Sequence, residues 1–396
     1  MTLRCIARGV APHRAAFAVR AAFATAVVVL AIPAAASAAT KTVGAGPPVT
    51  KPPPGVPEYG DATQFFPKTV TVHAGDSVRW KFFGFHNIYF PKKGGKNISL
   101  LVPDPSRIYT GEVDPAGQPF WFNGRRQLVG NPNVAFPRGG KTENGSKATG
   151  SGVPQSEHAI YKLTFPKTGT FTYYCSIHAG MTGTVKVVSR RARISSAAAD
   201  KKAVDKQIAA TIAEVKRNDS KPALTGNVIQ IGRDTVDSSL LHFFPDKKTV
   251  PVGTTLEFRM TPKGNEVHTV TFGTDAVFAK GGYAEKVGEA LLAPLPGTGQ
   301  SGPPVLGVPG AALFPSDPGP LAFDGTQHGG FANTGLLGTD VTKPLPESSK
   351  ITFTTPGTYN FMCLVHPEMR GTVTVQRPPP IEAASGRRTA AAVGRG

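Results

Sequence analysis

The chain has 396 residues, of which 40% are hydrophobic and 18% are charged, and its formal net charge is +18. Its 45 Gly and 37 Pro stay below the roughly 25–30% that marks low-complexity chains, so the composition excludes a mostly disordered chain and a collagen. The length predicts two or three domains, and three Cys are too few for a disulfide-stapled fold of this size.

The N-terminus has the pattern of a targeting segment. Four arginines precede the apolar run Ala21–Ala36, and Ala36-Ser37-Ala38 supplies the small residues of a cleavage site. We therefore predict a signal peptide over residues 1–38 and an exported mature protein, periplasmic or extracellular. An uncleaved membrane anchor is the alternative, but no other stretch of the sequence is long and apolar enough to span a bilayer.

Residues 39–189 predict a β-sandwich. Apolar and polar residues alternate in Val78–Phe82 and again in Phe171–Cys175, which is typical of strands that bury one face. Between these strands lies an insert rich in Gly and Pro, from about Pro91 to Gln155. Such a long insert is either a surface loop with a few packed aromatic residues or a lid that shapes access to a site.

The spacing of apolar residues changes from every second residue to helical spacing in residues 190–221, and this change predicts a helical linker. No Gly or Pro interrupts residues 196–217, and one apolar stripe recurs at helical spacing: Val204, Ile208, Ile212 and Val215. We expect this stripe to pack on a sandwich.

Residues 222–376 repeat the first half. Phe65-Phe66-Pro67 recurs as Phe243-Phe244-Pro245, and a second long insert runs from about Gly273 to Glu347. A duplication of this kind predicts that both halves share one all-β fold. The tail, residues 377–396, is rich in Pro, Ala and Arg and is predicted to be disordered.

Each half carries a C-x-x-H-x-x-M motif at the end of an alternating strand. The motif starts at Cys175 in the first half and at Cys363 in the second. Each half also has a histidine upstream in strand-like sequence, His86 and His268. Two His and one Cys with a weak axial Met form the donor set of a blue-copper electron-transfer site.

On these residues, both halves resemble cupredoxins, the type-1 blue-copper proteins of the plastocyanin and amicyanin type. The resemblance covers roughly residues 65–90, 156–188, 243–272 and 348–376. It implies two tandem Greek-key β-sandwiches with long loop inserts, one-electron transfer, and two type-1 copper ions. The implied ligand sets are His86, Cys175, His178 and Met181 in the first half, and His268, Cys363, His366 and Met369 in the second.

The residues next to the ligands differ between the halves. Asn87 follows His86 and Ser176 follows Cys175, and in plastocyanin-like proteins an Asn and a Ser at these places hydrogen-bond across the two ligand loops. The second half has Thr269 and Leu364 instead, so we expect that link to be weaker or absent there. The two sites should therefore differ in reduction potential.

The sequence favours an electron carrier over an enzyme. No H-x-H pair exists to hold a second, catalytic copper, so we expect no enzymatic activity. A copper storage or delivery protein is the alternative function, but such proteins use exposed Met- or His-rich tracts, and this chain has only 5 Met. Expected partners are redox proteins, either a cytochrome or a copper or haem oxidoreductase. Neither nucleic acid nor a stable membrane span after signal cleavage is expected.

The resemblance also implies where electrons enter. In cupredoxins the His of the loop reaches the surface, so His178 and His366 are the expected contact points. Residues 39–188 hold 17 basic and 8 acidic residues, whereas residues 222–376 hold 10 and 13. An acidic partner should therefore be attracted to the first half.

Overall fold

The computed structural model describes residues 38–377 except residues 50, 52, 155, 157, 158, 179, 263 and 340–344. Apart from Ala38 and Arg377, the predicted signal peptide and the predicted disordered tail lie outside the described residues. No helix within the described part of the chain is long and apolar enough to cross a membrane.

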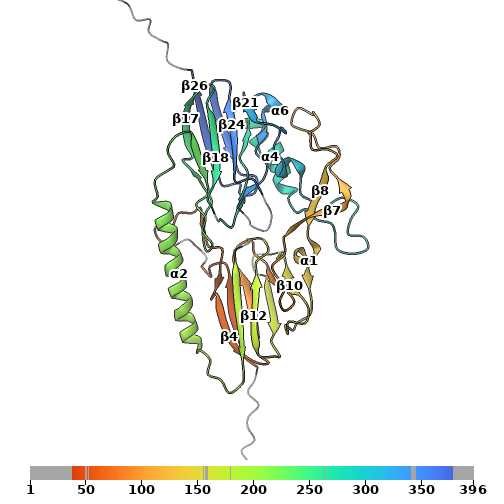
Figure 1. Cartoon of the computed structure of the whole chain (residues 1–396), viewed down its shortest axis with the longest axis vertical. Coiled ribbons are helices and arrows are strands. Elements are labelled where there is room, and N and C mark those ends of the chain that lie inside the picture. Colours follow the sequence, from red (N-terminus) through yellow and green to blue (C-terminus); the bar gives the residue numbers. More distant parts are fainter. Residues whose placement is uncertain are drawn as a thin grey trace, which may run out of the picture. The chain divides into compact units, whose positions relative to one another are not determined.

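The first half forms two sheets that share one hydrophobic core (Figure 1). Its strands are β1 (Thr40–Ala45), β3 (Phe65–Phe66), β4 (Thr69–His73), β5 (Ser77–Phe82), β6 (Ile88–Phe90), β9 (Pro137–Arg138), β10 (Thr149–Gly152), β11 (Ile160–Thr164), β12 (Gly169–Tyr174) and β13 (Thr182–Val188). One sheet has the order β11-β5-β1-β3 and the other the order β4-β13-β12-β6-β10-β9. In β5 the buried Val78, Trp80 and Phe82 alternate with the less buried Arg79 and Lys81, so the period-two pattern sets the inward face.

The second half repeats this sandwich with two five-stranded sheets. Its strands are β14 (Val228–Ile231), β16 (Phe243–Phe244), β17 (Lys247–Pro251), β18 (Thr255–Met260), β20 (Thr271–Gly273), β21 (Leu321–Phe323), β22 (Ala332–Asn333), β24 (Ser348–Phe353), β25 (Gly357–Met362) and β26 (Arg370–Gln376). The parallel pairs β14–β18 and β17–β26 correspond to β1–β5 and β4–β13. The predicted fold class, two tandem cupredoxin-like sandwiches, is therefore confirmed.

A single long helix, α2 (Ala197–Asp219), links the sandwiches, close to the predicted residues 196–217. Ser196 caps it, because its side chain accepts a hydrogen bond from the backbone N–H of Ala199. As predicted, the helix packs on the folded body. Val215 is buried with Leu240 and Phe244 of the second half, and the side chain of Gln64 donates a hydrogen bond of 2.6 Å to Thr211.

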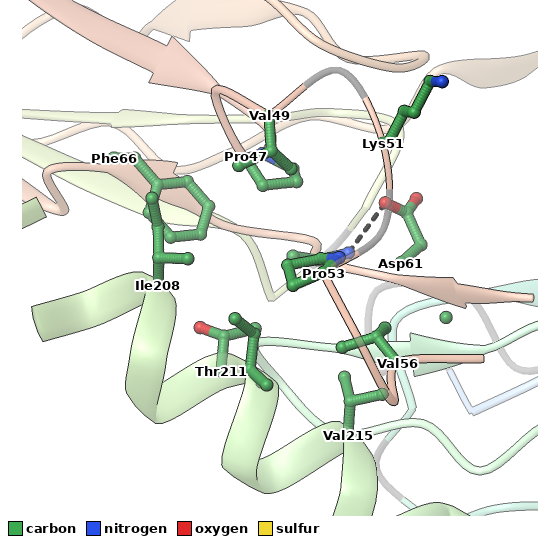
Figure 2. Close-up of a pocket in the computed structure, with 13 residues that line it drawn as sticks. Pro47, Val49, Lys51, Pro53, Val56, Asp61, Phe66, Ile208, Thr211 and Val215 are labelled. Carbon is green, nitrogen blue, oxygen red and sulfur yellow. Dashed lines mark hydrogen bonds between the residues drawn. The ribbon is translucent and has the colours of Figure 1, made fainter. Parts of the chain in front are cut away.

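A cavity of about 190 Å³ remains between α2 and the N-terminal segment (Figure 2). Ile208, Thr211 and Val215 line it from the helix, and Val56 and Phe66 line it from the first half. The cavity contains none of the predicted metal ligands.

The long inserts fold into short elements of their own. In the first half these include β7 (Leu101–Ile108), β8 (Arg126–Gly130) and α1 (Pro132–Ala135). In the second half they are α3 (Asp275–Phe278), α4 (Tyr283–Glu289), α5 (Gly310–Leu313), α6 (Gln327–Gly330) and β23 (Leu337–Gly338), which pairs with β19 (Val267–His268).

The two inserts bind each other. The carboxylate of Glu112 accepts hydrogen bonds from the backbone N–H groups of Gly310 (2.8 Å) and Ala311 (3.0 Å). A third hydrophobic cluster joins residues of both inserts to Met362 and Leu364, which flank Cys363. The inserts thus contain packed aromatic residues, as one of the two expectations had it, and these residues form a packed support beside the second motif.

The two halves contact each other so extensively that the chain from Ala38 onward forms one compact unit. The short strand β2 (Gly60–Asp61) of the first half pairs with β15 (Ser239–Leu240) of the second. The boundaries given above for each sandwich therefore remain a prediction.

Candidate metal centres

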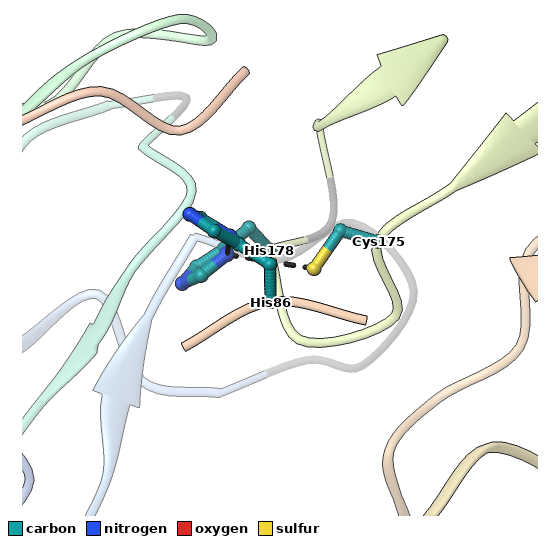
Figure 3. Close-up of side chains that lie close together, drawn as sticks. All are labelled: His86, Cys175 and His178. Carbon is teal, nitrogen blue, oxygen red and sulfur yellow. Dashed lines mark hydrogen bonds between the residues drawn. The ribbon is translucent and has the colours of Figure 1, made fainter. Parts of the chain in front are cut away.

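The first centre lies where two strands end and a loop returns. His86 lies two residues before the start of β6, and Cys175 directly follows β12. His178 lies in the loop that leads to β13. Figure 3 shows the two imidazoles lying together with the cysteine sulfur directed toward them. The Nδ1 atoms of His86 and His178 are 3.0 Å apart, and Sγ of Cys175 lies 3.5 Å from Nδ1 of His178.

The second centre repeats this arrangement. His268 ends β19, Cys363 follows β25, and His366 lies in the loop before β26. The two Nδ1 atoms are 3.1 Å apart, and Sγ of Cys363 lies 3.9 Å from Nδ1 of His268 and 3.8 Å from Nδ1 of His366. The structure thus brings together both predicted His/Cys/His groups.

These donor sets fit a bound metal. Bonds of about 2.0 Å to nitrogen and 2.3 Å to sulfur place neighbouring ligand atoms about 3.3–3.8 Å apart, close to the separations in both groups. Each group also brings two Nδ1 atoms and one sulfur within 4.8 Å of one another, and in the second group the backbone N–H of Thr269 donates a hydrogen bond to Sγ of Cys363 (3.3 Å). Two imidazoles and one thiolate are the equatorial set of a blue-copper site. Both cysteines are fully buried and free, so no disulfide joins them.

The two methionines lie in the same hydrophobic cores as the cysteines. Met181 is 1% exposed and Met369 is 0% exposed. The backbone N–H of Cys175 donates to the carbonyl of Met181 (3.0 Å), and that of Cys363 donates to the carbonyl of Met369 (3.1 Å). Each ligand loop is therefore closed by a backbone hydrogen bond between its cysteine and its methionine.

The predicted link across the ligand loops is present in both halves. In the first half, the backbone N–H of Ser176 donates to Oδ1 of Asn87 (2.7 Å). In the second, the backbone N–H of Leu364 donates to the hydroxyl of Thr269 (2.8 Å). The expectation of a weaker or absent link in the second half is therefore wrong, because a hydroxyl at this register accepts the same amide.

One further link was not predicted from the sequence. Asn97, in the first insert, donates from its side-chain amide to the carbonyl of Cys175 (3.1 Å) and accepts from the hydroxyl of Ser176 (2.8 Å). The sequence around Asn97 matches only the short glycosylation pattern Asn97-Ile98-Ser99, which does not indicate this role, because the role depends on how the insert folds back.

The metal-free ligands hold their protons differently in the two centres. Burial alone would raise the pKa of Cys175, but the imidazoles of His178 and His86 outweigh it and hold that pKa well below its usual range. Burial would also lower the pKa of His178, yet Glu266 and Cys175 raise it to about 10. In the second centre burial prevails, because it raises the pKa of Cys363 and lowers that of His366 to about 4. A metal that needs thiolate and neutral imidazole must therefore displace protons from different atoms in each centre.

Two buried carboxylates approach the far nitrogens of the imidazoles. Oε1 of Glu266 lies 3.4 Å from Nε2 of His178, and Oε2 lies 3.6 Å from Nε2 of His366. Oδ2 of Asp234 lies 3.6 Å from Nε2 of His268, and both of these side chains are completely buried. Sequence reasoning missed both carboxylates. A comparison of the two repeats could have pointed to Glu266, which stands two residues before His268. The first half has Gly84 at the same distance before His86.

The expected surface contact points are also corrected. His178 is only 6% exposed and the side chain of His366 is 17% exposed, and Glu266 of the second half lies against both imidazoles. The prediction that His178 reaches the surface is wrong.

The first half of the chain matches a known family. Residues 57–188 match the family model for copper binding proteins, plastocyanin/azurin family. Similar solved structures include the oxidised plastocyanin from Dryopteris crassirhizoma, which is 25% identical in sequence. The match covers 38% of this chain and 99% of that chain, with a TM-score of 0.19. A purple cupredoxin from Nitrosopumilus maritimus has 16% identity, covers 38% of this chain and 100% of its own, and has a TM-score of 0.20. A search of curated proteins gave no match. Residues 57–188, about a third of the chain, therefore match the copper-binding plastocyanin/azurin family, and the sheets of the second half repeat the fold of the first.

Proposed function

We propose that the chain is an exported electron-transfer protein with two mononuclear type-1 copper sites. The ligands would be His86, Cys175, His178 and Met181 in one site, and His268, Cys363, His366 and Met369 in the other. The observation that carries this proposal is the convergence, twice, of two Nδ1 atoms and one Sγ atom in a buried apolar setting. Copper bound there would supply a one-electron change between Cu(I) and Cu(II).

The protein's own residues keep these sites closed and fixed. Both cysteines are completely shielded from water. Each ligand loop is also held by a hydrogen bond from a backbone N–H to the side chain of Asn87 or Thr269. A site that cannot rearrange or admit water changes little when an electron arrives, which favours rapid transfer. Hydrogen bonds around the ligands orient them and tune the metal.

The same burial argues against the other functions considered. Storage or delivery needs ligands that exchange with partners, whereas His86 and His268 are 0% exposed. A catalytic copper would need further histidines, and the sequence has no H-x-H pair. The protein therefore acts with redox partners rather than on a small substrate, and a cytochrome or a copper or haem oxidoreductase would fit that role.

Copper loading and visible absorption test this proposal. The loaded protein should contain two coppers per chain and show intense thiolate-to-copper absorption when oxidised. Cys175→Ser should remove about half of the absorbance, Cys363→Ser the other half, and the double variant all of it. One copper per chain, or absorbance that neither change affects, would contradict the two-site assignment.

A further inference from the structure

The two ligand loops meet at one short segment of the second half, Asn265–His268. The side chain of Asn265 is 7% exposed and accepts a hydrogen bond from the backbone N–H of Gly180 (3.1 Å), within the first ligand loop. It also donates to the hydroxyl of Thr63 (3.2 Å) and to the carbonyl of Val236. A Cβ atom at Gly180 would lie 2.3 Å from Oδ1 of Asn265, so only glycine permits this approach. The segment is thereby fixed against the first centre.

Glu266, the next residue, lies between the two centres. It is 6% exposed, and one oxygen of its carboxylate faces His178 while the other faces His366. Among the ion pairs of the described residues, no Lys or Arg contacts it. A buried carboxylate is costly unless hydrogen-bond donors surround it, so the two imidazoles must be what this carboxylate binds.

Metal binding makes both imidazoles donors to Glu266. Nδ1 of each ring faces the cysteine sulfur, so a metal would occupy Nδ1 and leave the proton on Nε2. Nε2 is the atom that faces the carboxylate in both rings. Carboxylates commonly accept this proton from metal-bound histidine, but here one carboxylate would serve two histidines of different centres.

We propose that the contact His178–Glu266–His366 carries electrons between the two centres within one chain, an inference that rests on the proposed function. One electron leaves the reduced centre and the oxidised centre gains it, so no bond is made or broken and no other reactant is required. The burial of His178 supports this assignment, because an imidazole that is 6% exposed is a poor contact for an external protein. Electrons taken up at one centre can thus leave from the other.

Pulse reduction of the fully oxidised, copper-loaded protein tests the proposal. A single electron per chain should first reach one centre and then move to the other, in a phase whose rate does not depend on protein concentration. Electron paramagnetic resonance of rapidly frozen samples follows each centre, with the Cys175→Ser and Cys363→Ser variants as reference spectra. Glu266→Leu should slow the second phase by about tenfold or more, the usual scale for loss of a partner of a metal-bound histidine.

Two further variants sharpen the result. Glu266→Gln keeps the shape, but its amide group can accept from only one imidazole, so it should slow the phase as well. Glu112→Gln is the matched control, because Glu112 also joins the two halves but binds the amides of Gly310 and Ala311 far along the insert. This control should leave the rate unchanged.

A second measurement does not depend on electron flow. In the Cu(I)-loaded protein, nuclear magnetic resonance should show Nε2 protons of His178 and His366 that exchange slowly with water, and Glu266→Leu should make both exchange rapidly. Wild-type rates in both Glu266 variants would overturn the proposal, as would two loaded centres without the second phase. Absence of copper at both centres, seen first by metal analysis, would instead overturn the proposed function and this inference with it.

Discussion

Asp234 gives the two centres different electrostatic surroundings, and Asp234→Asn should raise the reduction potential of the second centre. The carboxylate lies 3.6 Å from Nε2 of His268 and neither of its oxygens has a hydrogen-bond partner. In both halves a glycine lies against the buried histidine, Gly46 in the first and Gly232 in the second. Two residues later the first half has Pro48, whereas the second half has Asp234. A negative charge favours the more positive oxidised state, so its removal favours reduction.

The magnitude follows from the distance. The imidazole adds about 2 Å between Nε2 and the ligating Nδ1, which puts the charge about 7 Å from a metal held there. At an effective dielectric constant of about 20, a unit charge at about 7 Å contributes about 2.4 kcal/mol, or about 100 mV for one electron. The shift at the first centre should be smaller, since the nearest contact of Asp234 is with the second.

A redox titration of the copper-loaded variant, followed by absorption, measures the shift. It should be run near pH 8, because burial raises the pKa of Asp234 to about 7 and the carboxylate must be ionised in the wild-type reference. Asp205→Asn, on the exposed face of α2, is the control and should move neither potential. An unchanged or lowered second potential, or equal shifts at both centres, would refute this electrostatic reasoning.

Three other substitutions follow from the packing. Thr269→Val leaves the N–H of Leu364 without its acceptor and should cost about 1–3 kcal/mol of unfolding free energy in denaturant titrations, with faster copper loss from the second centre only. Gly183→Ala would place a Cβ 2.2 Å from the ring of Tyr173, so it should destabilise by about 1–3 kcal/mol and lower the melting temperature. Phe122→Ala empties a fully buried site between the inserts, so it should cost about 3–5 kcal/mol and weaken copper retention at the second centre, measured by chelator competition.

Local sequence patterns were enough to predict the sandwiches, the linking helix and the two His/Cys/His groups. Strand alternation fixes which face is buried, and the C-x-x-H-x-x-M spacing returns a histidine beside the cysteine within one tight loop. The helix was predicted at residues 196–217 and runs from Ala197 to Asp219. Each of these features depends on residues that lie near one another in the chain or repeat in both halves.

Features that depend on contact between the halves escaped prediction. The insert residues around Phe122 pack beside Leu364, and Glu266 reaches His178, although 88 residues separate Glu266 from His178 in the sequence. The error at Thr269 has another cause. Its residue type differs from Asn87, but a hydroxyl oxygen and an amide oxygen accept the same backbone N–H, so the geometry is kept while the chemistry differs.

The asymmetry between Glu266 and Gly84 follows from the surroundings of each position. A metal at each Nδ1 leaves one Nε2 proton on His178 and one on His366, and the two oxygens of Glu266 face both. A side chain at position 84 would instead lie against Nε2 of His86, which is buried without a hydrogen-bond partner among the described residues. The backbone there also disfavours a side chain, since Gly84 has a φ of +96° and a Cβ atom would lie 3.3 Å from Nε2 of His86. The carboxylate that faces both centres therefore stands in the second repeat only, and the Gly84 backbone disfavours an equivalent side chain in the first.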